Sequence, residues 1–139
     1  MSVHQNLVPY LGFRSTAREA LTFYQQVFGG ELNISVFSDF GEGSTEEEGA
    51  RVMHGQLIVD GQPLLMASDT PDSRELPDKS STTIALFGGQ EDNERLRGYW
   101  AALADGGTIT LPLQLAPWGD AFGELNDRFG TPWFVNIAA

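Results

Sequence analysis

The chain carries one order of predicted elements twice, and this repeat restricts the folds open to it. A shift of 77 residues places Leu7 on Ile84 and Gly29-Gly30 on Gly106-Gly107. Each half reads as a strand, a helix and three further strands (β-α-β-β-β). One such half is too small to bury its own sheet, so two halves are expected to share a core. The order predicts an α+β fold and does not match the β-α-β-β-α-β order of a ferredoxin-like domain.

Periodicity and turn residues define the elements of each half. Residues 17–28 repeat apolar side chains at helical spacing, with Ser15 or Thr16 as the predicted cap and Gly29-Gly30 as the stop. Asp60-Gly61 is a strong hairpin signal. The predicted strands are 7–13, 32–37, 51–59 and 62–67 in the first half, and 82–87, 108–113, 119–126 and 132–137 in the second. A second helix runs from Asp92 or Asn93 to Ala104.

The domain organisation follows from these boundaries. We expect one domain over 1–139, with module one at about 6–69, a polar connector at about 70–80 and module two at about 81–139. Pro71, Pro77 and Lys79 belong to the connector. The acidic stretch with Glu42 and Glu46-Glu47-Glu48 lies among glycines, which favours a solvated loop over a metal cage.

Charge and composition exclude several function classes. Eight Lys and Arg face nineteen Asp and Glu, giving a formal charge of -11, and a nucleic-acid backbone would be repelled. No apolar run approaches the ~20 residues needed to cross a bilayer, and the first residues, with His4 among them, do not resemble a signal peptide. There is no cysteine, hence no disulfide, Fe–S cluster or thiol nucleophile. We expect a cytoplasmic protein without membrane or nucleic-acid partners.

An ordered set of short motifs, together with the doubled element order, resembles the vicinal oxygen chelate superfamily of glyoxalase I, bleomycin-resistance proteins and extradiol dioxygenases. Within it the chain is most similar to the PhnB-like branch, often labelled a 3-demethylubiquinone-9 3-methyltransferase-like domain. The motifs are 9–13 (PYLGF), 17–30 (AREALTFYQQVFGG), 54–57 (HGQL), 65–69 (LMASD), Gly106-Gly107, Pro117-Trp118, Phe122-Gly123 and 127–133 (DRFGTPW). The resemblance implies a curved, mixed eight-stranded sheet around a cleft, and homodimers.

The resemblance also implies where a divalent metal would bind, because metal-using members take two ligands of the His, Gln or Glu type from each module. The corresponding positions here fall near Pro9, near Met66 or Ser68, near Thr83 and near Phe134. None of these residues supplies the imidazole or carboxylate that Zn²⁺, Ni²⁺ or Fe²⁺ needs. We therefore expect no tightly bound metal and no other cofactor, and glyoxalase or dioxygenase chemistry is not supported.

Two polar residues on predicted strands are candidates for chemistry in the first half. His54 is either a general base or substrate hydrogen-bonder, since a free imidazole has a pKa of ~6.5, or a core imidazole bonded to the backbone. It shares a strand face with Gln56. Asp69 either orients His54 or caps the turn before Pro71.

In the second half, Glu124 interrupts an apolar stretch and is either a cleft acid–base group or a solvent-facing carboxylate. Trp118 either stacks on a flat ligand or belongs to the core. Tyr10 and Phe122 complete the predicted ligand contacts, with Gln56, Asp69 and Trp118, while His54 or Glu124 would transfer protons.

The predicted function is binding, with conversion left open, of a small organic molecule in the cleft. The alternatives are a metal-dependent lyase or dioxygenase with ligands displaced to His54, Asp69 and Glu124, and a drug-sequestering protein whose acidity suits a cationic guest. Gly41-Glu42-Gly43 opens no helix, and no GxGxxG motif is present, which argues against a usual cofactor-binding methyltransferase.

Overall fold

The chain folds into two compact units, Met1–Pro77 and Asp78–Ala139. The structure is a computed structural model, and it describes residues 6–76 and 81–139. His4, Pro77 and Lys79, which the sequence analysis discusses, lie outside the described residues.

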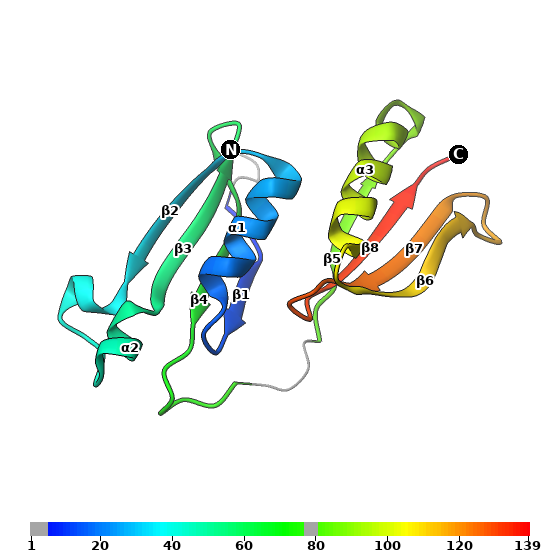
Figure 1. The fold of residues 1–139 in the computed structure, drawn as a ribbon. Helices are drawn as coiled ribbons and strands as arrows, with labels where there is room; N and C mark the ends of the chain where they lie inside the picture. The colour runs from blue at the N-terminus through cyan, green and yellow to red at the C-terminus, as the bar shows by residue number, and fades with distance from the viewer. Residues whose placement is uncertain (1–5, 77–80) are drawn as a thin grey trace. The chain divides into compact units, whose positions relative to one another are not determined.

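The first unit is a four-stranded sheet covered on one face by a helix (Figure 1). Its elements are β1 (Tyr10–Phe13), α1 (Ala17–Phe28), β2 (Glu31–Val36), the 3-10 helix η2 (Phe37–Phe40), α2 (Glu46–Ala50), β3 (Val52–Val59) and β4 (Gln62–Asp69). The strand order is β1-β4-β3-β2, in which β1 runs parallel to β4 and the other neighbours are antiparallel. The predicted helix 17–28 is confirmed, whereas α2 within the acidic loop was not predicted.

The second unit repeats this plan. Its elements are β5 (Ile84–Gly88), the 3-10 helix η3 (Gln90–Asp92), α3 (Asn93–Ala104), β6 (Thr108–Leu115), β7 (Ala121–Asn126) and β8 (Pro132–Ile137). The strand order β5-β8-β7-β6 again has one parallel pair, β5 with β8. The predicted α+β fold of two β-α-β-β-β modules with eight strands is confirmed, and the strands form two four-stranded sheets. No helix within 6–76 and 81–139 is long and apolar enough to span a membrane.

The core of the first unit lies between α1 and its sheet. Leu21 and Tyr24 of α1 are fully buried, as are Leu57 and Ala67 of the sheet. Gly55 of β3 allows the close approach, because a Cβ atom there would lie 2.5 Å from Leu21 Cδ1. Burying a large apolar side chain contributes roughly 1.5–3 kcal/mol. The face of the sheet that packs against α1 is therefore the internal face.

The second unit uses the same device. Leu96 of α3 packs with Val135 and Ile137 of β8, and the partly buried Trp100 joins this cluster. A Cβ atom on Gly123 of β7 would lie 2.8 Å from Trp100 Cη2 and 2.7 Å from the Cα atom of Leu113. In both units a glycine on the third strand, β3 or β7, therefore lets the helix pack closely against the sheet.

The start of α1 differs from the prediction. Thr16 occupies the N-cap position, but its side chain makes no capping hydrogen bond. Instead Asp69, at the end of β4, accepts the Ala17 N–H through Oδ1 and the Val52 N–H through Oδ2, each at 2.9 Å. The expectation that Ser15 or Thr16 caps the helix is wrong, because a buried carboxylate distant in sequence performs this role. The side chain of Asp92 likewise makes no cap on α3.

The hairpin signal at Asp60-Gly61 is confirmed by the backbone. Asp60 has φ 53° and Gly61 has φ 79°, so both turn residues adopt the left-handed conformation. Two consecutive positive φ values are typical of a type I′ turn, whose twist matches that of the flanking strands β3 and β4.

Candidate functional site

The face of the first sheet opposite α1 is rich in uncharged polar side chains. Gly55 and Leu57 are buried on the side of α1, so His54 and Gln56, which alternate with them along β3, lie on the opposite face. The ladders place Ser35 beside His54, and place both Asn33 and Met66 beside Gln56. We name this surface the polar face. Its members are Tyr10, Asn33, Ser35, His54, Gln56, Met66 and Ser68.

Tyr10 and His54 contact each other on the polar face. The Tyr10 hydroxyl lies 3.3 Å from His54 Nδ1, and the two ring centroids are 5.8 Å apart with an interplanar angle of 40°. Because a phenol hydroxyl is a better donor than acceptor, the contact favours the imidazole tautomer that carries its proton on Nε2. His54 then has Nδ1 held by the Tyr10 hydroxyl, and Nε2 is the ring nitrogen that carries the proton.

Asp69 lies on the other side of the same sheet. It is 4% exposed, and both of its carboxylate oxygens accept backbone N–H groups. From its place in the sequence, Asp69 is expected either to orient His54 or to cap the turn before Pro71. The structure instead brings Tyr10 to His54, while Asp69 joins α1 to β3 and β4.

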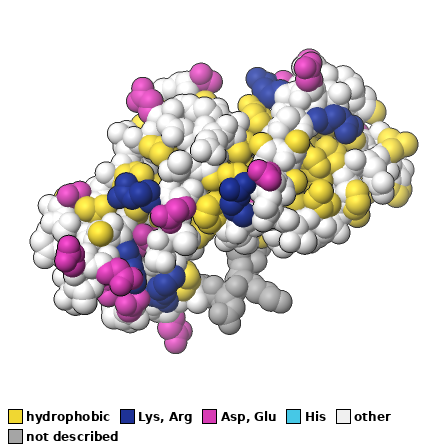
Figure 2. All heavy atoms as spheres, viewed as in Figure 1, with side chains coloured by type: hydrophobic (Ala, Val, Ile, Leu, Met, Phe, Trp, Pro, Cys, Tyr) yellow, Lys and Arg dark blue, Asp and Glu magenta, His cyan; other side chains and the backbone are white. Residues whose placement is uncertain are grey.

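The second sheet carries aromatic side chains in the corresponding place. The Trp118 and Phe122 ring centroids are 5.4 Å apart at 68°, and those of Phe122 and Phe134 are 5.3 Å apart at 37°. Glu124 follows Phe122 on the same face of β7 and lies opposite Phe134 in the ladder. Trp118 is 60% exposed, so it is not part of the core. We name Trp118, Phe122, Glu124 and Phe134 the aromatic face. Hydrophobic side chains also gather on the side of the second unit that Figure 2 shows.

The two faces occupy equivalent positions of the repeat. Gly55 pairs with Ala67 in the first sheet, and Gly123 pairs with Val135 in the second. The residues on either side of these glycines are therefore equivalent, His54 to Phe122 and Gln56 to Glu124. On the paired strands, Met66 is equivalent to Phe134. The ladders also make Leu11 of β1 equivalent to Leu86 of β5. This equivalence differs by two residues from the alignment of the first strands that the sequence predicts.

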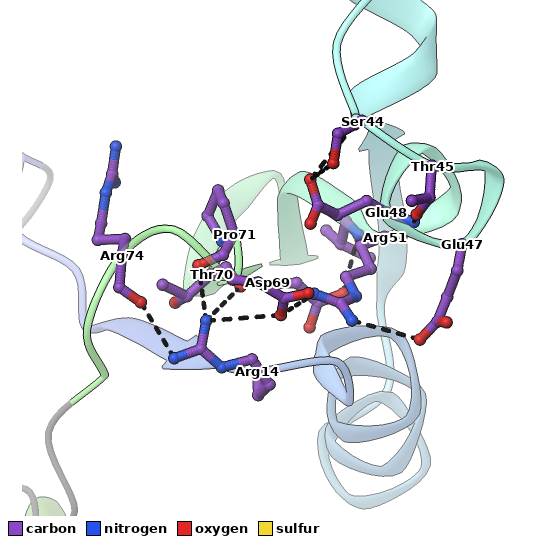
Figure 3. Close-up of polar contacts among 12 residues, drawn as sticks. Arg14, Ser44, Thr45, Glu47, Glu48, Arg51, Asp69, Thr70, Pro71 and Arg74 are labelled. Atoms are coloured by element: carbon purple, nitrogen blue, oxygen red, sulfur yellow. Dashed lines mark hydrogen bonds and ion pairs between the residues drawn. The ribbon is translucent and has the colours of Figure 1, made fainter.

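Two arginines that the sequence analysis did not single out hold the segment after β4. Arg14 donates from Nη1 to the carbonyl oxygens of Thr70 at 3.0 Å and Pro71 at 2.6 Å, and from Nη2 to that of Arg74 at 3.1 Å. Figure 3 shows Arg14 reaching these carbonyls from the end of β1. The signal in the sequence was weak, because an arginine beside a strand end has no local partner that reveals such a contact.

Arg51 forms the second anchor, between α2 and β3. Its guanidinium donates to Asp72 Oδ1 at 2.9 Å and to Glu47 Oε1 at 3.3 Å (Figure 3). The hydrogen bond from Arg51 is the largest cause that holds the pKa of the Asp72 carboxyl below its ordinary value, and the same bond raises the pKa of Arg51. These contacts fix the chain path around the first unit rather than forming a reactive site.

The metal positions implied by the resemblance do not fit a metal. Met66 and Ser68 lie on the polar face, and Phe134 lies on the aromatic face, and none of the three offers an imidazole or a carboxylate. Within 6–76 and 81–139 no three His, Cys, Asp or Glu side chains gather in a way that could hold an ion. His54 and Asp69 point to opposite faces of one sheet, so these two side chains do not converge on a common point.

These two modules, each a helix on a four-stranded sheet with one parallel pair, define a vicinal oxygen chelate fold. The chain belongs to the 3-demethylubiquinone-9 3-methyltransferase family, the PhnB-like branch of that superfamily, whose family model matches residues 5–136.

Similar proteins span almost the full length of the chain. Protein YjdN of Escherichia coli (strain K12) is 27% identical over 94% of this chain and 94% of its own. The crystal structure of protein PA1353 from Pseudomonas aeruginosa is 31% identical, covers 95% of this chain and 96% of its own, and has a TM-score of 0.78. The structure of the PhnB protein from Bacillus cereus is 26% identical, covers 96% of this chain and 100% of its own, and has a TM-score of 0.74.

Proposed function

We propose that the protein binds a small organic molecule on the sheet faces that its helices leave uncovered. The observation that carries this proposal is the contact between Tyr10 and His54, 3.3 Å from hydroxyl to Nδ1, on a face whose other members are mostly uncharged hydrogen-bonding groups. A protein that needed this face only for solubility would place charged side chains there. Amide, hydroxyl and imidazole groups suit a polar ligand better, since they donate and accept without a fixed charge.

Each polar residue has a distinct role in the proposal. His54 supplies Nε2 as hydrogen-bond donor and, where conversion occurs, as the proton-transfer group. Tyr10 holds the imidazole, and Gln56 provides an amide that can both donate and accept. In the second unit Trp118 and Phe122 provide apolar contact, and Glu124 provides a carboxylate. Asp69 does not belong to this set, because the fold uses both of its oxygens.

The family description names a methyltransferase, but the fold does not favour that activity. A nucleotide-type cofactor is usually held where a Gly-rich turn leads from a parallel strand into a helix of a βαβ unit. Gly41 and Gly43 lie in the acidic stretch between η2 and α2, and α2 has only five residues. A metal-dependent lyase or dioxygenase with ligands at His54, Asp69 and Glu124 is the second candidate, and it is not favoured because His54 and Asp69 lie on opposite faces of the first sheet and both Asp69 oxygens accept backbone N–H groups.

The test is a ligand screen with residue-resolved detection. A metabolite collection is first screened by thermal shift, where a ligand at a hundredfold its Kd stabilises by ~2.7 kcal/mol. Hits are then titrated against His54→Ala and Tyr10→Phe, with Gln26→Ala on the exposed side of α1 as the matched control. The proposal expects weaker binding in the two face variants and unchanged binding in the control. Hits that bind all variants equally would contradict it.

Two predictions about the protein in its cell remain part of the proposal. Homodimer formation is implied by the superfamily resemblance, and sedimentation of the full chain tests it. Cytoplasmic location follows from the sequence analysis, and cell fractionation tests it.

A further inference from the structure

We propose that the aromatic face of the second unit binds an organic cation, such as the quaternary or tertiary ammonium group of a small molecule. The inference rests on the proposed small-molecule binding and adds the chemical class of the ligand. It is carried by three neighbouring rings and one carboxylate on a single sheet face.

The rings are arranged as a corner rather than a flat stack. Phe122 is the central ring, with Trp118 inclined to it by 68° and Phe134 by 37°, at centroid separations of 5.4 and 5.3 Å. A group seated in such a corner meets more than one ring. The face of an aromatic ring is electron-rich, and a cation within about 6 Å of its centroid is attracted. Trp118, the strongest partner for a cation among these residue types, is also the most open to solvent, at 60% exposed.

Glu124 supplies the matching charge. It is exposed and lies beside Phe134 and Leu111 in the ladder, two residues beyond Phe122 on the same strand face. Within the described part of the chain its carboxylate has no hydrogen bond or ion pair. A carboxylate left unpaired among apolar groups is available to a positively charged ligand.

The arginines of the second unit already have polar partners elsewhere. Arg95 pairs with Asp92, and Arg97 donates to Asn93 Oδ1 at 2.9 Å, both along α3. Arg128 donates to the carbonyl and carboxylate oxygens of Asp105. The aromatic face thus keeps its negative character, and the chain as a whole, at -11, attracts cations and repels anions.

An organic cation fits this surface better than a metal ion. Ca²⁺ and Mg²⁺ require several oxygen ligands, and one carboxylate with three hydrocarbon rings does not supply them. An alkylated ammonium group is poorly hydrated and gains from contact with rings on several sides. The site therefore selects a ligand in which the charge is surrounded by carbon.

The experiment compares choline with its uncharged isostere 3,3-dimethyl-1-butanol, at constant ionic strength. Binding to the full chain is followed by amide and indole NMR shifts, which detect the weak affinities expected of such small compounds. The proposal expects choline to shift the indole signal of Trp118 and the amides around Phe122, and to bind more tightly than the isostere. Glu124→Gln and Trp118→Leu should each weaken choline binding by about two- to fivefold or more.

Matched controls separate the outcomes. Glu94→Gln removes the same charge from the exposed side of α3, and Phe40→Leu removes an exposed ring from the first unit. Both should leave choline binding unchanged. Equal binding of the two compounds, no binding of choline, or an equal loss in Glu94→Gln and Glu124→Gln would overturn the inference. The proposed function fails separately, when no hit from the metabolite screen binds more weakly to His54→Ala or Tyr10→Phe than to the Gln26→Ala control.

Discussion

Removing the Asp69 carboxylate is expected to destabilise the first unit strongly. Its two oxygens accept the N–H groups of Ala17 and Val52, both at 2.9 Å, in a site where Asp69 is 4% exposed. A hydrogen bond to a charged group contributes about 1.5–3 kcal/mol, and removing the acceptor leaves two backbone donors without a partner. We expect Asp69→Ala to lower the free energy of unfolding by about 3–4 kcal/mol, a large part of the 5–15 kcal/mol typical of a domain.

Asp69→Asn gives a graded comparison. The amide keeps one acceptor oxygen but places an NH₂ group toward the second donor, so we expect about half the loss, roughly 2 kcal/mol. Asp60→Asn is the matched control, because it makes the same chemical change at an exposed turn where Asn-Gly is equally suited to positive φ. Its effect should stay within about 0.5 kcal/mol.

The assay can assign the loss to one unit. All three tryptophans, Trp100, Trp118 and Trp133, belong to the second unit, so tryptophan fluorescence during urea unfolding reports that unit, while circular dichroism reports both. Hydrogen exchange of the Ala17 and Val52 amides measures the two bonds directly. Unfolding of Asp69→Ala at the same urea concentration as Asp60→Asn, with both amides still protected, would refute the reasoning.

Two further predictions concern packing and pH. Gly55→Ala should cost about 1–3 kcal/mol, since the new Cβ would lie 2.5 Å from buried Leu21 Cδ1, whereas Gly98→Ala in α3, with nothing within 4 Å, should stabilise by about 0.5–1 kcal/mol in urea unfolding. The folded-state pKa of Asp72 is lowered, chiefly by Arg51, so its contribution to stability is present above the unfolded-state pKa and lost as pH falls through the folded-state value. Asp72→Asn should therefore be less stable than the parent chain at neutral pH, with the difference vanishing on acidification; a difference that persists in strong acid would contradict the linkage.

Local patterns predicted most of the fold. The helix 17–28 and the strand 132–137 have the expected bounds, because each combines strong periodicity with a nearby turn glycine, Gly29 after the helix and Gly130 before the strand. The short α2 was missed because glycines surround it; its cap is the Thr45 side chain, which accepts the Glu48 N–H.

Contacts between distant residues were the part that local patterns did not reveal. The cap of α1 comes from Asp69, and the partner of His54 is Tyr10, which reaches across β4 from β1. Such pairings depend on which strands become neighbours, and this is settled by the parallel β1–β4 ladder rather than by any nearby residue. Tyr10, His54, Gln56, Trp118, Phe122 and Glu124 were nevertheless named from the sequence. Strand alternation separates His54, Gln56, Phe122 and Glu124 from the residues that pack against the helices, whereas Trp118 lies in the turn before β7.

At equivalent ladder positions of the two sheets, the inward-facing residues are alike and the outward-facing residues differ. Gly55 and Gly123 face inward and set how closely a helix can dock, while their outward neighbours His54 and Phe122 differ completely in character. The outward-facing side chains of a sheet can therefore change without disturbing the inward-facing residues that pack against the helix. A chain built from two such repeats therefore presents two outward surfaces, and the side chains of each can change while the helix contacts beneath it stay the same.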